Sequence, residues 1–532
     1  MNFVNNSLNQ TNPKATSREW IGLAVLALPC LLYSMDLTVL NLAVPSISED
    51  LHPSSTQLLW IIDIYGFLVA GSLITMGTLG DRIGRRKLLL MGAAAFGVTS
   101  ILAAFSTTPT MLIASRALLG FAGATLAPST LSLIRNMFLD DKQRTVAISI
   151  WITSYSAGAA IGPPLGGLLL EYFWWGSVFL LAVPVMVLLL ILGPILLPEF
   201  KDPNAGKPDI LSAGLSLAGV LLVIFGLKRI ATEGFDVLPA ASIVAGLVVG
   251  ALFVRRQLSL ADPLIDLKLF KQSKFSAALV TYMMGAVVMF GAFVFIYQYL
   301  QLVLDLSPLE AGIWAMPFAG GFIVASMLSP MVVRKFRPGY VMSAGMLIAA
   351  IGLAILTQLS VDSSPVLLVV AMVIISVGFS PVFTLATDMM IGSAPPERAG
   401  AAASIAETNA EFGGALGIAI LGSLGTALYR SELMDTIPSG LSPSSIESAR
   451  STLGGAHSAA AELNGPLGAQ LLDAAKLAFV DSIEVTMAIC AALALCTSVL
   501  VLVMLRNVNL TPHDDGVIEM PAERELAEAG ID

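Results

Sequence analysis

Long apolar runs alternate with short polar segments along the chain from residue 20 to residue 505. A helix needs about 20 mostly apolar residues to cross the hydrocarbon core of a bilayer. Fourteen runs of that size are present, at 20–45, 57–79, 87–106, 110–134, 144–170, 176–197, 209–229, 237–255, 276–302, 310–333, 339–359, 365–391, 401–428 and 482–505. The pattern predicts an all-α membrane protein with 14 transmembrane helices.

Two polar joints, near 203–208 and 261–274, divide the runs into groups of six, two and six. Segment 430–481, rich in Ser, Ala, Gly and acids, is expected to form an extracellular helical hairpin, with a role in gating or binding as the alternative. The predicted organisation is a cytoplasmic tail at 1–19, a six-helix bundle at 20–197, two inserted spans at 198–275, a second six-helix bundle at 276–505 and a cytoplasmic tail at 506–532.

Composition and charge placement support this interpretation. Hydrophobic residues make up 56% of the chain and charged residues only 12%, whereas soluble proteins carry about 25% charged residues. Lys and Arg concentrate on the segments that are cytoplasmic when both termini are cytoplasmic, as the positive-inside rule requires. We therefore expect a multi-pass protein of the plasma (inner) membrane in contact with membrane lipids. The scattered bases exclude a nucleic-acid surface, and no metal or cofactor is expected.

The loop at 77–87 is short, glycine-rich and basic. Its glycines permit a tight reversal, and its basic residues hold it on the cytoplasmic side. Asp81 is an acid among these bases, and such a charge needs a partner.

A few ionisable residues lie within the predicted spans, where a charge costs several kcal/mol and indicates function by default. They are Asp36, Asp63, Arg116, Asp388, Glu407 and Glu411. Glu407 and Glu411 are four residues apart and share a helical face, so their repulsion favours protonation of one of them near neutral pH.

Structural roles are alternatives for each of these groups. Arg116 is expected to form a buried ion pair, with Asp36 as the candidate partner, which is compatible with a coupling role. Asp63 and Glu411 could face water at a helix end, and this is the favoured interpretation for Asp388. Arg116 is the only basic residue counted within a span.

The fifth span contains small residues at Gly158 and Gly162, followed by Pro163 and Pro164. Small residues four apart permit close helix packing. The paired prolines remove backbone donors and are expected to break the hydrogen-bond ladder and kink the helix.

Together, the 77–87 loop, the arginine-containing fourth span and the Gly-Pro-Pro segment of the fifth span resemble the drug:proton antiporters of the major facilitator superfamily. Asp36, Thr38, Asn41, Ala43 and Pro45 resemble the first-span signature of the fourteen-span branch. An acid at the position of Asp63 is similar to the quaternary ammonium exporters of that branch. The resemblance covers residues 18–506 and implies the major facilitator fold: two six-helix bundles that rock around a central cavity, plus two additional helices.

The resemblance also assigns roles. It implies proton coupling by Asp36 and Arg116, and recognition of cations or protons by Asp63, Glu407 and Glu411. The residues it implies in conformational switching are Asp81, Arg82, Gly84, Arg85, Gly158, Gly162 and Pro163. The tenth span has no acid at Gly320-Gly321-Phe322, which favours monovalent over divalent cations as substrates.

The implied activity is proton-coupled efflux of lipophilic cations, such as quaternary ammonium antiseptics and dyes, by a monomer. An exporter of an endogenous metabolite or natural product on the same fold is the main alternative, because a fold does not fix a substrate. An enzyme is not expected, since no catalytic motif is present and all three histidines lie outside the spans. A receptor or scaffold would leave the intramembrane acids unexplained.

Overall fold

The computed structural model describes residues 14–53, 55–201, 209–233, 235–260, 263–265, 267–395, 398–463 and 466–506. Over these ranges the chain is helical and has no strand. Thirteen of its helices are long and apolar enough to cross a membrane, and α9 has a shorter apolar stretch at Leu211–Leu227. The predicted fourteen runs therefore correspond to these thirteen helices and α9.

The first six spans form the N-terminal bundle. Its elements are α1 (Ser17–Leu51), α2 (Ser55–Ile83), α3 (Arg85–Ala104), α4 (Pro109–Gly123), α5 (Leu126–Met137), α6 (Asp141–Tyr172), α7 (Ser177–Leu180) and α8 (Ala182–Leu196). The fourth and sixth runs are each divided in two, as α4 with α5 and α7 with α8. The most extensive packing in this bundle joins α1 to α6.

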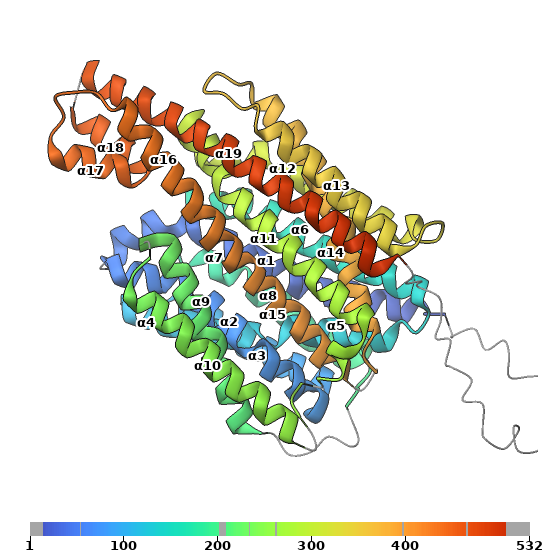
Figure 1. Cartoon of the computed structure of the whole chain (residues 1–532). Coiled ribbons are helices and arrows are strands. Elements are labelled where there is room, and N and C mark those ends of the chain that lie inside the picture. The colour runs from blue at the N-terminus through green and yellow to red at the C-terminus, as the bar shows by residue number, and fades with distance from the viewer. Residues whose placement is uncertain are drawn as a thin grey trace, which may run out of the picture.

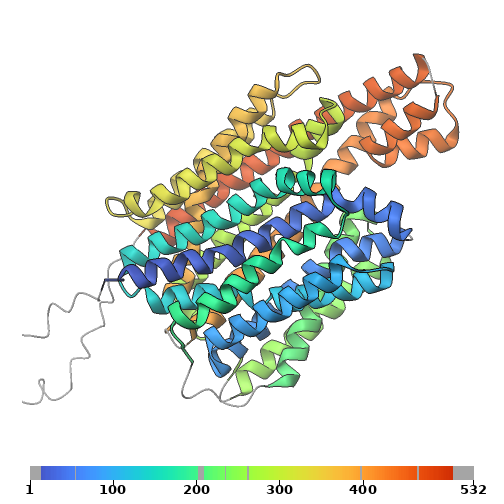
Figure 2. The same cartoon turned by 180° about the vertical axis from the view of Figure 1, so that it is seen from behind.

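The second group of six spans forms the C-terminal bundle. Its elements are the short η1 (Leu269–Lys271), α11 (Ser273–Gln298), η2 (Tyr299–Val303), α12 (Pro308–Val332), α13 (Pro338–Leu356), α14 (Pro365–Gly392), α15 (Ala399–Gly417), η4 (Ile418–Gly422), α16 (Ser423–Thr436) and α19 (Pro466–Leu505). The thirteenth run is thus longer than predicted, since α15, η4 and α16 follow one another without a break. Figure 2 shows both bundles from behind, with the N-terminal bundle in blue to teal.

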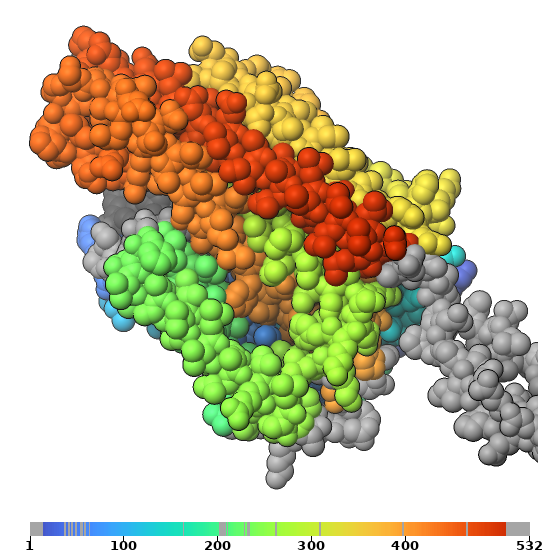
Figure 3. Space-filling model, in the orientation of Figure 1, coloured from blue at the N-terminus to red at the C-terminus, as the bar shows by residue number. Residues whose placement is uncertain are grey.

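Segment 430–481 contains two short helices, α17 (Pro443–Ser451) and α18 (Leu453–Leu463), which we call the hairpin. Together with the adjoining ends of α16 and α19, it projects beyond the bundles (Figures 1 and 3). A ring nitrogen of His457 lies 2.8 Å from the Leu302 carbonyl oxygen, and Lys476 Nζ lies 2.5 Å from Asp305 Oδ2. These contacts fix the hairpin to the end of α11 and η2. We call this end of the molecule the hairpin end.

We call the opposite end, which carries the 77–87 loop, the basic end. Both described chain ends lie there: the Ala15 amide donates to Gln143 Oε1 (2.7 Å), and Arg337 Nη1 donates to the Arg506 carbonyl (3.0 Å). The two bundles pack against each other through α2 and α5 on α15, and through α6 on α12 and α14. No such packing joins α1 to α11 in the described chain.

The inserted helices α9 (Ile210–Glu233) and α10 (Val237–Ser259) form an antiparallel pair on the outside of the bundles (Figure 1). They do not simply lie beside the fold, because α9 packs on both bundles. Val220 and Ile224 contact Phe67 and Ala70 of α2. One turn further along α9, a second apolar group joins the C-terminal bundle and consists of Val223, Leu227, Ala415 and Ala419.

The Gly-Pro-Pro segment does not interrupt its helix, contrary to the predicted break, because α6 is continuous from Asp141 to Tyr172. Close packing along its length holds this segment helical. A Cβ at Gly158 would overlap the carbonyl of Leu31, and one at Gly166 would lie 2.7 Å from Val39 Cγ1. Gly162 is buried on the same helix, whereas the side chain of Pro163 lies outside the part that the structure describes.

Candidate functional site

Arg116 and Asp36 form the ion pair that the sequence predicted within the N-terminal bundle. Arg116 Nη1 lies 2.7 Å from Asp36 Oδ2, and Arg116 Nε donates to the carbonyl of Ile61 at 3.2 Å. The arginine side chain is only 1% exposed, while that of Asp36 is 16% exposed. The buried charge of Arg116 is therefore compensated by a carboxylate on α1 and a backbone oxygen on α2.

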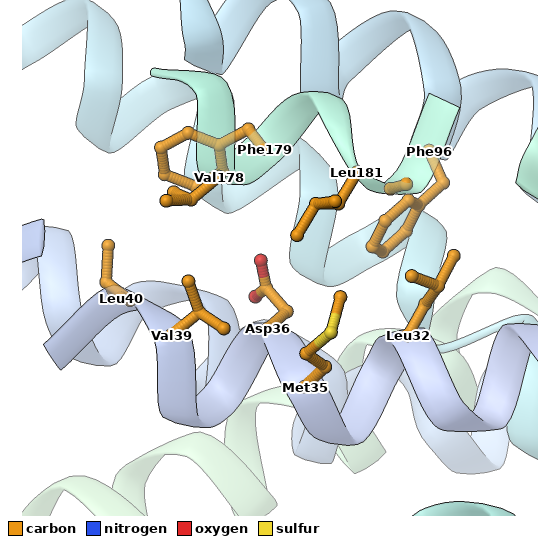
Figure 4. A pocket seen from close by; sticks show the side chains of 10 residues that line it. Leu32, Met35, Asp36, Val39, Leu40, Phe96, Val178, Phe179 and Leu181 are labelled. Carbon is orange, nitrogen blue, oxygen red and sulfur yellow. The ribbon is translucent and has the colours of Figure 1, made fainter. Parts of the chain in front are cut away.

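Asp36 also borders a small pocket between α1, α3, α7 and α8. Figure 4 shows its carboxylate pointing from α1 toward Val178, Phe179 and Leu181. The rest of the lining is apolar, from Leu32, Met35, Val39, Leu40, Phe96 and Ala182. One carboxylate oxygen of Asp36 is thus bound to Arg116. The carboxylate also borders a pocket whose other lining side chains are apolar, so water or a proton donor entering the pocket would find Asp36 as the polar side chain of the lining.

The two acids of α15, Glu407 and Glu411, are partly buried where this helix faces the N-terminal bundle. Tyr33 of α1 donates a long hydrogen bond (3.5 Å) to Glu411 Oε1. Glu407 forms no hydrogen bond or ion pair with any residue that the structure describes. Its charge nevertheless acts on Tyr33 and Tyr155 of the N-terminal bundle and on Tyr282 of α11.

Aromatic side chains from five helices surround this region. The ring of Tyr33 lies 6.0 Å from that of Tyr65 on α2, and the ring of Tyr282 lies 4.7 Å from that of Phe383 on α14. On α6, the ring of Tyr155 lies 5.6 Å from that of Tyr33, and the ring of Trp151 lies 4.6 Å from that of Tyr155. The acids of α15 are therefore set among aromatic surfaces that can contact an apolar cation.

Asp63 lies in α2, but its side chain falls outside the described residues, as do those of Thr38, Asn41 and Pro45. The predicted roles of these four residues stay predictions.

The 77–87 loop meets the C-terminal bundle at the start of α15. Asp81 and Arg85 form a buried ion pair, and Asp81 Oδ2 accepts a hydrogen bond from the amide of Ala401 (3.2 Å). A carboxylate at a helix N-terminus is favoured by the unpaired amides and the helix dipole. Asp81 thus has the partner that the sequence demanded, and part of that partnership crosses to the other bundle.

Glycine makes this contact possible. A Cβ at Gly77 would lie 2.6 Å from the Gly400 carbonyl, and one at Gly400 would overlap the guanidinium of Arg85. Gly84 has φ of 115°, a backbone conformation that favours glycine, and ends the reversal between α2 and α3. Arg82 is partly buried in the same turn.

A second charged contact between the bundles was missed. Arg144 of α6 donates from Nε to Asp388 Oδ1 of α14 (2.9 Å), and Thr145 donates to Asp388 Oδ2 (2.8 Å). Asp388 is 1% exposed, so its predicted exposure to water was wrong. Arg116 is also not the only buried base, because Arg85 and Arg144 are 1% and 4% exposed.

The residues just before Arg144 in the sequence carried a weak signal of an ion pair. Arg144 lies at the predicted start of the fifth span, shortly after Asp140 and Asp141. In the structure Asp141 does pair with Arg144 (2.6 Å), but it occupies only one side of the guanidinium. The other side is available to Asp388.

Comparison with known proteins identifies the family of the chain. A family model described as Major Facilitator Superfamily matches residues 26–418. The multidrug efflux pump LfrA of Mycolicibacterium smegmatis is 42% identical over 494 residues, covering 93% of this chain and 98% of that protein. The methyl viologen resistance protein SmvA of Salmonella typhimurium is 36% identical over 483 residues, covering 88% and 95%.

Among solved structures, the human organic anion transporter MFSD10 matches with a TM-score of 0.60 at 14% identity, covering 91% of this chain and 99% of that one. This likeness concerns the fold alone. The expected fold of two six-helix bundles with two additional helices is confirmed, as is the expectation that the protein is not an enzyme. The chain belongs to the Major Facilitator Superfamily and is a multi-pass membrane transporter.

Proposed function

We propose that the protein exports lipophilic cations in exchange for protons. The observation that carries this proposal is Glu407, a partly buried acid without a hydrogen bond or ion pair among the described residues, set beside aromatic rings. A carboxylate within a membrane protein is costly unless something occupies it. A proton or an apolar cation would satisfy it, and contact of the cation with an aromatic face adds about 2 kcal/mol in a desolvated site.

The relatives support export of drugs in general. LfrA is named a multidrug efflux pump and SmvA a methyl viologen resistance protein, and both align over most of this chain. Quaternary ammonium compounds and dyes fit the acid-and-aromatic surroundings of Glu407 and Glu411. Asp63 is proposed as a further cation-binding acid from the sequence.

The proposed cycle uses competition at carboxylates. Glu407 or Glu411 holds the cation, and a proton displaces it because one carboxylate cannot bind both with full affinity. Asp36 and Arg116 handle the coupled proton, since protonation of Asp36 would release Arg116 from its only carboxylate partner in the described chain. Exchange of one proton for one monovalent cation moves no net charge and is driven by the pH difference alone.

The orientation follows from charge placement. We propose that the basic end faces the cytoplasm, with both termini there, and that the hairpin end faces outward. The bundles pack together at the basic end, so with that end inward we propose that this arrangement is closed toward the cytoplasm. The bundles at 20–197 and 276–505 would rock as units around the acids, with 198–275 as the insertion.

The test is exchange in proteoliposomes. With a lumen more acidic than the outside, purified protein should carry ethidium into the vesicles as protons leave. The lumen should therefore become more alkaline in proportion to the ethidium taken up. Glu407→Gln should lower this exchange at least ten-fold, and Asp36→Asn should abolish it, because each removes a proton-binding group. Glu462→Gln, which removes an exposed charge from the hairpin, is the matched control.

Unchanged dye exchange by both variants would refute the proposal. A substrate panel with an anion, a neutral natural product, ethidium and methyl viologen separates the alternatives. Proton movement driven only by the neutral compound would favour export of a metabolite. Anion export is disfavoured by the pairing of Arg116 with Asp36, which leaves its charge compensated.

A further inference from the structure

Helix α1 carries side chains of both candidate sites, one turn apart. Tyr33 is 7% exposed and points across the bundle interface, where its hydroxyl donates to Glu411 Oε1 of α15. Asp36, three residues later, pairs with Arg116 inside the N-terminal bundle. Residues three apart lie on neighbouring parts of a helix surface. A displacement of α1 at Tyr33 therefore moves Asp36 as well.

Tyr65 of α2 completes a second connection between the same sites. The guanidinium carbon of Arg116 lies 4.7 Å from the centroid of the Tyr65 ring, and that ring lies 6.0 Å from the ring of Tyr33. Tyr65 is fully buried, so it has no freedom to swing away. Glu411 and Asp36 are thus linked twice, along α1 and through the successive contacts of Tyr33, Tyr65 and Arg116.

We propose that Tyr33 is the positioning residue that transmits the occupancy of Glu411 to the Asp36–Arg116 pair. This inference rests on the proposed exchange function. While Glu411 is charged and empty, the Tyr33 hydroxyl donates to it across the bundle interface at an oxygen–oxygen distance of 3.5 Å. We expect this long bond to strengthen when the carboxylate is ionised, because a bond to a charged acceptor is stronger than a neutral one. A cation or proton at Glu411 competes for the same oxygens and weakens the bond. Helix α1 is then released, and Asp36 moves relative to Arg116.

The groups around Glu411 determine how the connection between Tyr33 and Glu411 would respond to pH. The described groups whose charges or dipoles reach it are Tyr33 from α1, Tyr65 from α2, Tyr282 from α11 and Glu407 on its own helix. Tyr33 is the donor of a hydrogen bond to Glu411. Donation to the carboxylate favours the charged form, which is the form that binds a cation. Without this donor, protons displace the cation from Glu411 at a higher pH.

The variant Tyr33→Phe removes one oxygen and keeps the ring. Tyr155→Phe is the matched control, because the Tyr155 ring packs edge-on against that of Tyr33 and its buried hydroxyl has no hydrogen-bond partner among the described residues. Both variants and the wild type would be reconstituted in proteoliposomes. Three quantities would be measured: pH-driven ethidium exchange, ethidium counterflow without a pH difference, and the pH midpoint of ethidium binding.

For Tyr33→Phe we expect pH-driven exchange to fall about ten-fold, as for the loss of one hydrogen bond to a charged group. Counterflow should stay within about two-fold, and the binding midpoint should rise by about one pH unit. Tyr155→Phe should leave the midpoint in place. A purely structural role of Tyr33 would instead lower exchange and counterflow together without moving the midpoint, and that result overturns the inference.

Adding Tyr33→Phe to Glu411→Gln distinguishes coupling from misfolding. If Tyr33 acts through the charged acid, it should cause no further loss of exchange in the Glu411→Gln background, whereas additive losses contradict the inference. The wild type tests the proposed function separately. Wild-type protein that exchanges no protons for ethidium would refute cation–proton exchange itself, whereas an active wild type with a Tyr33→Phe variant that behaves like Tyr155→Phe would refute only the role of Tyr33.

Discussion

The two bundles are joined at the basic end by two contacts of different chemistry. Between α2 and α15, glycines bring the backbones together, and the ion pair of Asp81 with Arg85 stays within the N-terminal bundle. Only one described hydrogen bond, from the Ala401 amide to Asp81, crosses there. Between α6 and α14, the ion pair of Arg144 with Asp388 itself spans the interface. We call these the glycine contact and the ion-pair contact.

The two contacts therefore depend on different properties of their residues: the glycine contact on small size, and the ion-pair contact on charge. The glycine contact depends on the absence of a side chain, so added volume should open it while lost charge should matter little. The ion-pair contact depends on two buried charges, so loss of charge should weaken it even when the shape is kept. Breaking a buried pair by removing one partner costs about 3–5 kcal/mol, whereas inserting a methylene into a packed contact costs about 1–3 kcal/mol.

The largest effect should come from Asp388→Asn, which keeps the shape and removes the charge facing Arg144. We expect the closed state of the basic end to lose about 3 kcal/mol, because Arg144 is buried and keeps only Asp141. Spin labels at the exposed positions Lys87 and Lys335, one on each bundle, would report the opening as a longer distance distribution. Asp141→Asn is the control, since it removes a partner of the same arginine without touching the interface. Equal opening by both variants would contradict a role for the ion pair across the interface.

An intermediate effect should come from Gly77→Ala. The new methyl group would meet the Gly400 carbonyl and Ser404, so the populations of closed and open basic ends should shift about ten-fold toward open, equivalent to about 1.4 kcal/mol. The same spin-label pair measures this. Gly66→Ala lies on the same helix, where a Cβ meets nothing within 4 Å, and should leave the distances unchanged. Closure that persists with alanine at position 77 would mean that the helices do not need this close approach.

The smallest effect should come from Asp81→Asn. The ion pair with Arg85 that this variant breaks lies within one bundle, so we expect it in both open and closed states. Across the interface asparagine can still accept from the Ala401 amide, so only a charge at a helix N-terminus is lost there, worth about 0.3–1 kcal/mol. We expect turnover of ethidium exchange to slow about two- to five-fold with the same relative rates across a substrate panel. A changed order of substrates would show that Asp81 influences recognition and not only the conformational cycle.

Much of the fold could be predicted from the sequence because the bilayer imposes a length and polarity on every crossing. Apolar runs therefore located the spans, including the weak helix α9. The pairing of Arg116 with Asp36 was also accessible, since a lone base deep in a span must find an acid. The positions of Arg116 and Asp36 within their spans were sufficient to predict this ion pair.

Position within a span gave the wrong prediction for Asp388, which is buried and not exposed to water. It lies near the end of its span, where water is the default partner, and its actual partner Arg144 is 244 residues away in sequence. Hydropathy reports how deep a residue lies but not which face of a helix meets the other bundle. The hydrogen bond from Tyr33 to Glu411 was missed for the same reason, since a tyrosine in an apolar run carries no signal of its partner.

The position of α9 has a mechanical consequence. One helix cannot stay fixed to two bodies that turn relative to each other, so any rocking of the bundles must shear α9 along either Phe67 and Ala70 or Ala415 and Ala419. Both contact groups are apolar, so sliding along either would break no polar bond within them. Helix α9 therefore covers the seam between α2 and α15 in the described chain, and the proposed rocking would require it to slide along one side of that seam.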